Sequence, residues 1–402
     1  MNKTILCVGA GIFQYYAIKK AKESGLRVFA IDKDEHAPGI ALCDNFMPVS
    51  TKDIDAAIKA AKSLNKIHKI NGVMTCGTDV SYTVAHIAKA LNLPGIPPET
   101  ALKATNKGIM REALKKGRVT VPEFSIINNL KDAISAAKKL KYPLVIKPVD
   151  NMGARGVRKL SCDKDLIVAW DEAFKYSTCK NIIIEKFVDG HEISLETIVE
   201  NGKVHLVTIA DRIIASSPYF IERGHTIPSI RPVNELKAAF QMAIKGIKAL
   251  NITRGPVKFD MKLSSHGPII GEMTARSSGG FHSQLTEPLA TGMSSIKAVI
   301  DLALGFPLDI SDITPKFLHA AAERSIYPKP GVVTSIKGVE KARAMKNIAG
   351  IFLNVREGDT LFPLKSNIGK AGHVVGFGNT RKEAIKTTLN AVKAIHIKTA
   401  EK

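Results

Sequence analysis

The sequence predicts mixed α/β and α+β structure, with a doubly wound parallel domain first, a mixed module next and a small α+β unit at the end. Over the first 98 residues, apolar strands alternate with helix-length stretches, which is typical of a parallel sheet covered by helices. Farther along, strands follow one another closely, which favours antiparallel pairing. Of the 402 residues, 45% are hydrophobic and 24% are charged, so the composition is that of a folded globular protein.

We expect the first domain to span residues 1–98. A glycine turn at Gly9 and Gly11 joins its first strand to its first helix, and Asp32 ends the second strand. The proline-rich segment 93–98 closes the domain, because proline lacks a backbone donor and restricts the residue before it. The expected strands are 4–8, 27–31 and 72–76, and the expected later helices are 53–64 and 80–91.

The middle module is expected to span residues 99–315. One of its helices has a stripe of apolar residues at spacings of four, four, three and three, which predicts a buried face. That stripe consists of Leu236, Phe240, Ile244, Ile247 and Leu250. The other expected elements are helices 107–116 and 130–140 and strands 143–147, 181–187, 192–199, 204–209, 256–263 and 268–273.

The last unit is expected to span residues 316–402 and to combine strands with one helix. The helix carries an apolar face made of Ile385, Leu389, Val392 and Ile395. The expected strands are 318–324, 332–337, 351–355 and 373–377.

The formal net charge of +21 is the unusual bulk property of the chain. Such an excess attracts nucleotides, nucleic acid, acidic substrates or anionic lipid, and it does not determine the fold. The basic residues are spread out, and Trp170 is the single tryptophan, so the interleaving of cations and aromatics that a nucleic-acid groove needs is missing. We therefore expect no nucleic-acid partner.

The five cysteines are odd in number and lack metal-ligand spacing. The apolar run at the N-terminus turns at Gly9 without a small-residue cleavage site, so it is interpreted as a strand rather than a signal peptide. Since no run of 18 apolar residues occurs, we expect no membrane span, and the cysteine pattern favours a reduced, cytoplasmic protein.

The first candidate motif is the turn from Gly9 to Gln14, between a strand and a helix. A dinucleotide fingerprint requires glycine at its first, third and sixth places, and Gln14 occupies the sixth. Three interpretations stay open: a tight turn, a loop that offers backbone donors to an anion or carboxylate, and an NAD site.

The second candidate motif places Lys147 at a strand end, before a loop that contains Gly153, Arg155 and Gly156. Lysine supplies a point charge for phosphate oxygens, and glycines let backbone N–H groups approach them. The alternative is a β-hairpin with a glycine turn.

The third candidate motif runs from Glu185 to Glu192 and joins two apolar strands. Here Glu185 can accept from the adenine amino group, the backbones of Lys186 and Val188 can contact the adenine edge, and Glu192 can hold ribose hydroxyls. A charged hairpin is the alternative.

The fourth candidate motif pairs Asp260 with Glu272, twelve residues later, across a turn that can bring both onto one face of a hairpin. Two carboxylates beside a phosphate site suit Mg²⁺, which also takes phosphate oxygens and water. Arg276 would then stabilise charge on a transferring phosphoryl group. The alternative is a surface salt bridge.

In this order, Lys107 and the second, third and fourth motifs resemble the ATP-grasp superfamily over about 170 residues. Residues 1–98 are similar to the pre-ATP-grasp domain, residues 99–315 to the two-subdomain ATP-grasp module, and residues 316–402 to the C-terminal cap of the carboxylase and amino-acid-ligase branches. The layout also resembles a short relative of the carbamoyl-phosphate synthetase large subunit. Within the superfamily we favour the L-amino acid ligase branch.

The resemblance implies ATP with Mg²⁺ or Mn²⁺ as the cofactors. Lys107 and Lys147 would bind phosphates under the glycine loop, and Arg276 would meet the γ-phosphate or an acyl phosphate. The metal would be held by Asp260, where the family usually has Glu, by Glu272 and by Thr274, where the family usually has Asn. The nucleotide would contact Lys107, Lys147, Gly153, Arg155, Gly156, Glu185, Lys186, Val188 and Glu192.

The implied reaction activates a carboxylate as an acyl phosphate, which an amine then attacks to release ADP and phosphate. Arg276 and Lys147 would be catalytic, and no Ser, Cys or His nucleophile is required. We expect small-molecule carboxylate and amine substrates, in particular amino acids or peptides, and a homodimer is an open expectation. The candidate substrate residues are Gly9, Gly11, Arg212, His225, Arg231, Ser277 and Gly279.

Four other functions remain as alternatives. A carboxyphosphate-forming carboxylase and a carbamoyl-phosphate-synthetase-like enzyme would share the nucleotide site. The interpretation as a basic nucleic-acid-binding protein is supported only by the net charge. The interpretation as an NAD-dependent oxidoreductase is supported only by Gly9 and Gly11.

Overall fold

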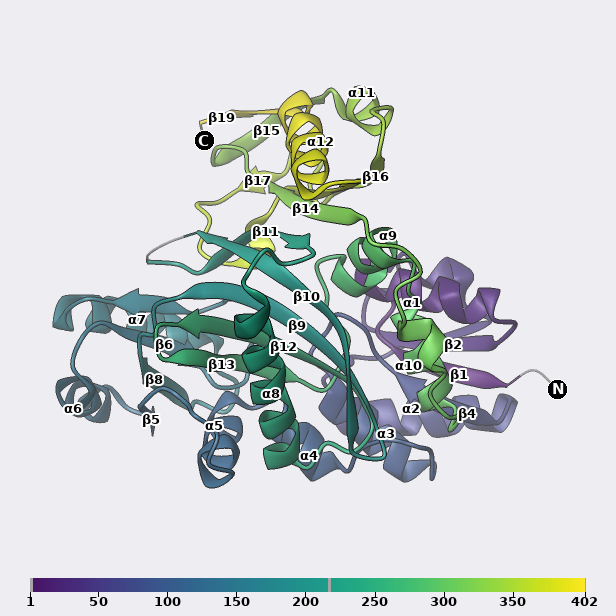
Figure 1. Ribbon diagram of the computed structural model, residues 1–402, viewed down its shortest axis with the longest axis horizontal. Helices are drawn as coiled ribbons and strands as arrows, with labels where there is room; N and C mark the ends of the chain where they lie inside the picture. The colour runs from purple at the N-terminus through teal and green to yellow at the C-terminus, as the bar shows by residue number, and fades with distance from the viewer. Residues whose placement is uncertain (1–2, 216–217, 402) are drawn as a thin grey trace.

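The computed structural model describes residues 3–215 and 218–401 of the chain. In Figure 1 the first domain lies at the right, a small sheet with its helices at the left, a large sheet across the centre and the C-terminal unit at the top. The predicted combination of α/β and α+β structure is confirmed.

The first domain is built on a four-stranded parallel sheet in the order β3-β2-β1-β4. Side chains alternate along its strands, so Ile5 belongs to the core on one face, with Ala17 of α1, and Leu6 to the core on the other face, with Ala57 of α2. The sheet is therefore doubly wound, as predicted. The strand β3 was not predicted, because it is short and ends in proline. The strands are β1 (Thr4–Val8), β2 (Arg27–Asp32), β3 (Asn45–Pro48) and β4 (Ile70–Met74).

The helices of this domain begin and end close to their expected positions. Asp53 caps α2 by accepting a hydrogen bond from the backbone N–H of Ala56 at 3.0 Å, which satisfies an otherwise unpaired donor. A later helix, α10, packs against β4 and α1 and completes the core on that side of the sheet. The helices are α1 (Ile12–Glu23), α2 (Ile54–Ile67), α3 (Ser81–Ala90), α4 (Pro98–Lys103) and α10 (Ser295–Ala303).

The small sheet is antiparallel, in the order β5-β8-β6-β7, and α6 and α7 pack against it. The helix α5 precedes it, and Asn106 caps that helix by accepting from the N–H groups of Gly108 and Ile109. The helices α5 and α6 match the prediction at both ends. The elements are α5 (Lys107–Lys116), β5 (Phe124–Ile127), α6 (Leu130–Leu140), β6 (Leu144–Pro148), β7 (Arg158–Leu160), α7 (Asp163–Tyr176) and β8 (Ile182–Lys186).

The large sheet has eight antiparallel strands in the order β13-β12-β9-β10-β11-β14-β18-β16. Antiparallel pairing of the predicted middle strands is thus confirmed, whereas β11 was not predicted. The strands are β9 (His191–Glu200), β10 (Lys203–Ala215), β11 (Ile221–Ile227), β12 (Gly255–Ser264), β13 (Gly267–Thr274), β14 (Ala320–Ile326), β16 (Ile348–Leu353) and β18 (Gly372–Gly378).

The helix α8 (Val233–Leu250) covers β12 and β13, but its buried face differs from the expected stripe. Leu236, Phe240 and Ile244 are only partly buried. The helix lies close to the sheet, since a Cβ on Gly246 would come within 2.8 Å of Ile270 Cδ1. Small residues therefore occupy the contact, and the buried face is Ala239, Ala243, Gly246, Ile247 and Leu250.

The C-terminal unit continues the large sheet. Its strand β14 pairs with β11, so the division expected after residue 315 falls within a hydrogen-bonded sheet. In α12, Leu389 is 39% exposed, while Ala384, Thr388 and Ala391 form the buried face, so the predicted stripe is wrong at Leu389. The remaining elements are α9 (Glu287–Thr291), β15 (Gly331–Lys337), α11 (Val339–Arg343), β17 (Thr360–Leu361), the 3₁₀ turn η4 (Asn367–Gly369), α12 (Arg381–Ala394) and β19 (His396–Ala400).

Candidate active site

A cleft of about 670 Å³ gathers most of the predicted site residues. Its walls come from the first domain at Asp79, the small sheet at Lys147, the large sheet at Asp260 and the C-terminal unit at Lys370. A volume of this size accommodates a drug-sized ligand. The predicted residues that line it are Lys107, Lys147, Gly153, Arg155, Glu185, Lys186, Val188, Glu192, Arg212, His225, Asp260, Glu272, Arg276 and Gly279.

Lys107 is the first residue of α5, where the Asn106 cap fixes the start of the helix. Its Nζ lies 2.8 Å from Glu272 Oε1 and donates to the carbonyl oxygen of Asn151 at 2.6 Å. Burial alone would lower the pKa of Lys107, but the Glu272 carboxylate raises it above its usual value. The lysine therefore stays charged while connecting the metal-site candidate to the glycine loop.

A second buried group of charges lies behind Lys147. Glu185 is paired at Oε1 with Arg111 Nε, 2.5 Å away, and at Oε2 with Lys147 Nζ. Burial would raise the pKa of Glu185, but these two cations lower it to about 2. Both oxygens of Glu185 are thus engaged in positioning cations, which competes with the adenine contact expected of it.

Sequence reasoning missed Arg111, although its position carried a signal. It lies one helical turn after Lys107 on α5, so both side chains are on the same face. Its Nη2 also donates to the carbonyl oxygen of Gly271 at 2.6 Å, which ties α5 to β13 beside Glu272.

The glycine loop joins β6 to β7, so the hairpin expected as an alternative is present. Gly153 and Gly156 both have φ of +69°, a conformation that favours glycine. Gly156 packs against α7, where a Cβ would lie 3.1 Å from Ala173 Cα, and it does not line the cleft. The Gly153 carbonyl oxygen accepts a hydrogen bond from the backbone N–H of Asn367 at 2.9 Å, so the C-terminal unit touches this loop directly.

The segment after β8 forms the apolar end of the cleft. Phe187 stacks on Phe220 with centroids 6.2 Å apart, and Val188 adjoins them in the cleft wall. Lys262 lies over the Phe187 ring at 4.6 Å and also pairs with Glu192 at 3.3 Å. Flat apolar surface next to backbone donors and acceptors suits a nucleobase.

Asp260 and Glu272 are direct cross-strand partners in the β12–β13 ladder. Asp260 pairs with Arg212 at 3.0 Å and with Lys258, and Lys107 pairs with Glu272. Burial raises the pKa of Glu272, but Lys107 and Lys258 lower it below its usual value, so it is ionised. The predicted hairpin geometry of this pair is present.

The donor set at this pair fits Mg²⁺. Two carboxylates on adjacent strands supply hard oxygen ligands. The described residues hold no larger group, of three or more His, Cys, Asp or Glu, arranged for a metal. Phosphate oxygens and water would complete the shell, as Mg²⁺ prefers. Thr274, on the same strand, is buried and lies outside the cleft lining.

Arg276 is held by the first domain. Its Nε is paired with Asp79, which sequence reasoning missed, and its Nη1 donates to the Ser277 carbonyl oxygen at 3.0 Å. Ser277 itself lies outside the lining and accepts from the Gly77 N–H at 3.2 Å. Burial would lower the pKa of Arg276, whereas Asp79 raises it. The end of β13 is therefore fixed against the residues that follow β4.

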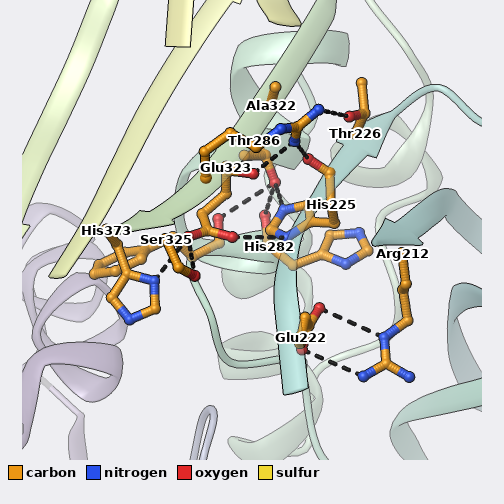
Figure 2. A network of polar contacts seen from close by, with 12 residues as sticks. Arg212, Glu222, His225, Thr226, His282, Thr286, Ala322, Glu323, Ser325 and His373 are labelled. Carbon is orange, nitrogen blue, oxygen red and sulfur yellow. Dashed lines mark hydrogen bonds and ion pairs between the residues drawn. The ribbon is translucent and has the colours of Figure 1, made fainter. Parts of the chain in front are cut away.

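A polar cluster occupies the wall shared by β11, β14 and β18. Figure 2 shows Glu323 between two histidines: its Oε1 lies 2.8 Å from His373 Nδ1, and its Oε2 lies 3.8 Å from His225 Nδ1. The Nε2 of His225 is 2.8 Å from Thr286 Oγ1. Burial, with His282 stacked at 5.1 Å, lowers the pKa of His225 well below its usual value, so this imidazole is neutral.

In the same view, Glu222 faces Arg212, with the carboxylate and guanidinium 3.2 Å apart. Burial would raise the pKa of Glu222, but Arg212, followed by Lys370, lowers it below its usual range. Arg212 also lies 3.0 Å from Asp260 and so joins the polar cluster to the metal-site candidate. It lies 3.3 Å from Glu192, the ribose candidate.

The glycine turn of the first domain forms a different environment. The side chain of Gln14 packs over Gly9 and Gly11 and hydrogen-bonds to Cys76 and Thr78, while Asp32 accepts from the Ala10 N–H at 2.8 Å. Neither Gly9 nor Gly11 is among the described residues that line the cleft. The structure favours the tight-turn interpretation.

Arg231, the remaining substrate candidate, pairs with Glu235 on α8 at 3.1 Å and lies outside the cleft lining.

Among the described helices, none combines the length and apolar character needed to cross a membrane.

Three known domain families match successive parts of the chain. The ATP-grasp N-terminal domain matches residues 18–95, the ATP-grasp domain residues 140–284, and the L-amino acid ligase C-terminal domain 2 residues 324–400. The chain belongs to the ATP-grasp superfamily. Within it, the chain is a member of the carboxylate–amine ligases, the ADP-forming enzymes that make carbon–nitrogen bonds.

Three proteins illustrate what the chain is similar to. An L-amino acid ligase from Bacillus licheniformis is 25% identical, with a TM-score of 0.86 and coverage of 100% of this chain and 99% of that one. Carnosine synthase 1 of Gallus gallus is 23% identical over 85% of this chain, which spans 40% of that protein. The biotin carboxylase domain dimer of Hydrogenobacter thermophilus 2-oxoglutarate carboxylase, solved with MgADP and bicarbonate, has 16% identity, a TM-score of 0.76 and coverage of 99% and 91%.

Proposed function

We propose that this ligase joins an amino-acid or peptide carboxylate to an amine, with ATP and a divalent cation as cofactors. The observation that carries the proposal is the pair Asp260 and Glu272, directly opposite each other in the ladder and beside the cations Lys107 and Arg276. The similarity of the C-terminal unit to that of L-amino acid ligases supports amino-acid substrates.

The phosphates would lie between Lys107, Lys147 and the glycine loop. Lys147 is half-buried and directed by Glu185, so its charge is preorganised and little reorganisation is needed when phosphate oxygens enter. The apolar end of the cleft at Phe187 and Val188 would take the base, and Glu192 the ribose.

The two carboxylates would hold Mg²⁺, which neutralises phosphate charge when bound. Arg276, fixed by Asp79, would stabilise the negative charge that develops on the transferring phosphoryl group. The chain acts by positioning and by charge compensation, because attack by the substrate carboxylate on the γ-phosphate needs no protein nucleophile.

The substrates would occupy the wall beside the glycine-rich segment at Gly279 and the polar cluster around His225. The neutral His225 imidazole presents a hydrogen-bonding group without adding positive charge. Glu222, held by Arg212, supplies a carboxylate for an ammonium or amine group.

An isotope experiment tests the proposal. With bicarbonate removed, ATP·Mg²⁺ is supplied with pooled amino acids and dipeptides whose carboxylates carry oxygen-18. We expect ADP rather than AMP, transfer of oxygen-18 into the released phosphate, and a new amide product. Formation of AMP, or turnover that depends strictly on bicarbonate, contradicts the proposal, and the second outcome would favour a carboxylase. ATP·Mg²⁺, and not NADH, is expected to raise the melting temperature by mass action.

A further inference from the structure

Lys258, on β12, is a cation in the cleft wall to which the proposed function gives no role. Its Nζ forms an ion pair with Oδ2 of Asp260, two residues farther along the strand, and only 15% of its side chain is exposed. Burial raises the pKa of Glu272, whereas Lys107 and, to a smaller extent, Lys258 lower it. The ammonium group of Lys258 therefore acts on both carboxylates of the metal-site candidate.

The strand register places Lys258 beside the third predicted metal residue, Thr274. In the β12–β13 ladder, Asp260 lies opposite Glu272. Two residues away along the same strands, Lys258 lies opposite Thr274. Residues two apart on a strand point to the same face, and residues opposite each other have Cβ atoms about 5 Å apart. Lys258 thus lies next to the position from which a third protein ligand would reach a metal.

Thr274 itself is not placed to be that ligand. It is 3% exposed and lies outside the cleft lining, whereas Lys258, its partner in the ladder, lines the cleft. The Oδ1 atom of Asp260 makes no hydrogen bond among the described residues, although Arg212 Nη1 lies 3.0 Å from it, so this oxygen keeps lone pairs for a metal. The two carboxylates therefore offer oxygen ligands to one cation, and the neighbouring pair offers an ammonium group in place of an oxygen.

The charge of the cleft also favours a small number of metal ions. Among the described residues that line it, ten are Lys or Arg and six are Asp or Glu. Enzymes that transfer phosphoryl groups compensate the phosphate charge with one or two divalent cations and with Lys or Arg side chains. A second divalent cation beside Lys258 would be repelled by the ammonium group and would gain no further carboxylate ligand.

We infer that the ligase binds one divalent cation per nucleotide, at Asp260 and Glu272, and that the Lys258 ammonium group supplies the positive charge that a second cation would otherwise bring to the phosphates. This inference rests on the proposed function and deepens it. When the nucleotide binds, Lys258 exchanges its partner Asp260 for a phosphate oxygen. Lys258 is thus a catalytic residue that contacts the nucleotide.

The number of bound metal ions tests the inference. Wild-type protein is dialysed against Mn²⁺ and the β,γ-methylene analogue of ATP, and the Mn²⁺ retained with and without the analogue is measured. Two-metal sites hold their ions about 3.5–4 Å apart, which is close enough for spin coupling to appear in electron paramagnetic resonance. We expect one analogue-dependent Mn²⁺ for each protein molecule and a spectrum without coupling.

Variants at position 258 test the role of the lysine. Lys258→Met keeps the length but removes the charge, and ADP release should fall by about tenfold to a hundredfold, the range for a hydrogen bond to a charged group. Lys258→Arg should retain part of the activity. Lys258→Asp adds a carboxylate beside the existing pair and should bind a second, coupled Mn²⁺. Lys203→Met, exposed at the start of β10 and outside the cleft lining, is the control and should behave as wild type.

Three outcomes would overturn the inference: a coupled pair of Mn²⁺ ions in the wild-type protein, wild-type turnover by Lys258→Met, or a single Mn²⁺ in a folded Lys258→Asp protein. Circular dichroism melts identify any loss of folding, and the wild-type count remains decisive even if a variant fails to fold. Failure of the wild-type protein to bind the analogue with any Mn²⁺ would instead contradict the proposed function itself.

Discussion

Asp260 and Glu272 face each other across adjacent strands, and each forms an ion pair with a lysine. Lys258 pairs with Asp260, and Lys107 pairs with Glu272. In this state the lysines neutralise the two carboxylates. A metal–nucleotide complex entering the cleft would take over that neutralisation and free both ammonium groups for phosphate oxygens. The same four side chains would then pair with one another before the complex binds and contact it afterwards.

Replacing either carboxylate by its amide should abolish most of the activity. Asp260→Asn and Glu272→Gln each remove one charged ligand from the metal-site candidate, so we expect turnover to fall by about a hundredfold or more, measured as ADP release. Glu340→Gln, on the exposed side of α11, is the matched control and should leave turnover unchanged. Normal ADP release by both site variants would show that the pair does not hold the metal.

Protonation of the buried Glu185 carboxylate should lower the stability of the folded protein at acidic pH. The folded-state pKa of Glu185 is about 2 and its usual value is 4.5, so its stabilising effect is present above pH 4.5 and is lost as the pH falls towards 2. Glu185→Gln leaves Arg111 and Lys147 uncompensated and should cost about 3 kcal/mol near pH 7. In urea denaturation, the difference from wild type should shrink below about pH 4.5. A difference that stays constant down to pH 3 would be inconsistent with this account.

Ionisation of Glu287 should lower the stability of the folded protein as the pH rises. It is fully buried, and burial together with the nearby Glu196 raises its pKa above the usual carboxyl value of 4.5. Its contribution to stability is therefore complete below pH 4.5 and is lost as the pH rises through the raised pKa. Glu287→Gln, which cannot ionise, should flatten the decline in melting temperature between about pH 5 and pH 9. An equally steep decline in the variant would mean that Glu287 is not the titrating group.

Asn367 should control the order of the glycine loop. Asn367→Ala removes the acceptor of the Glu222 N–H and loosens the segment whose backbone also donates to Gly153. We expect faster amide hydrogen exchange in residues 149–157 and a severalfold higher KM for ATP, with kcat changed less. Asn390→Ala, on the exposed face of α12 and outside the cleft lining, serves as the control. Unchanged exchange in the loop would indicate that the contact with Gly153 does not restrain it.

The order of the site motifs could be predicted because each is local. Lys147 and its glycines, Glu185 to Glu192, and the Asp260–Glu272 hairpin are each defined within a dozen or so residues, and turn chemistry and strand alternation place them. The cleft indeed brings them together.

What could not be predicted depends on contacts between distant segments. Arg111 reaches Glu185, 74 residues away, and Arg276 reaches Asp79, 197 residues away. The wall around Glu323, Lys370 and His373 exists because β14 pairs with β11, and no local pattern specifies which strands of a sheet become neighbours. The fold class could therefore be predicted from the sequence, and the wall around Glu323, Lys370 and His373 could not.

The pairing of β11 with β14 limits how this chain can be engineered. A cut after residue 315 would leave the β11 edge with unsatisfied donors and acceptors, open to pairing with another molecule. Truncated forms should therefore aggregate rather than persist as trimmed enzymes. For the same reason, exchanging the last 87 residues between this chain and a related ligase would require more than a suitable linker. The register between β11 and β14 would also have to match.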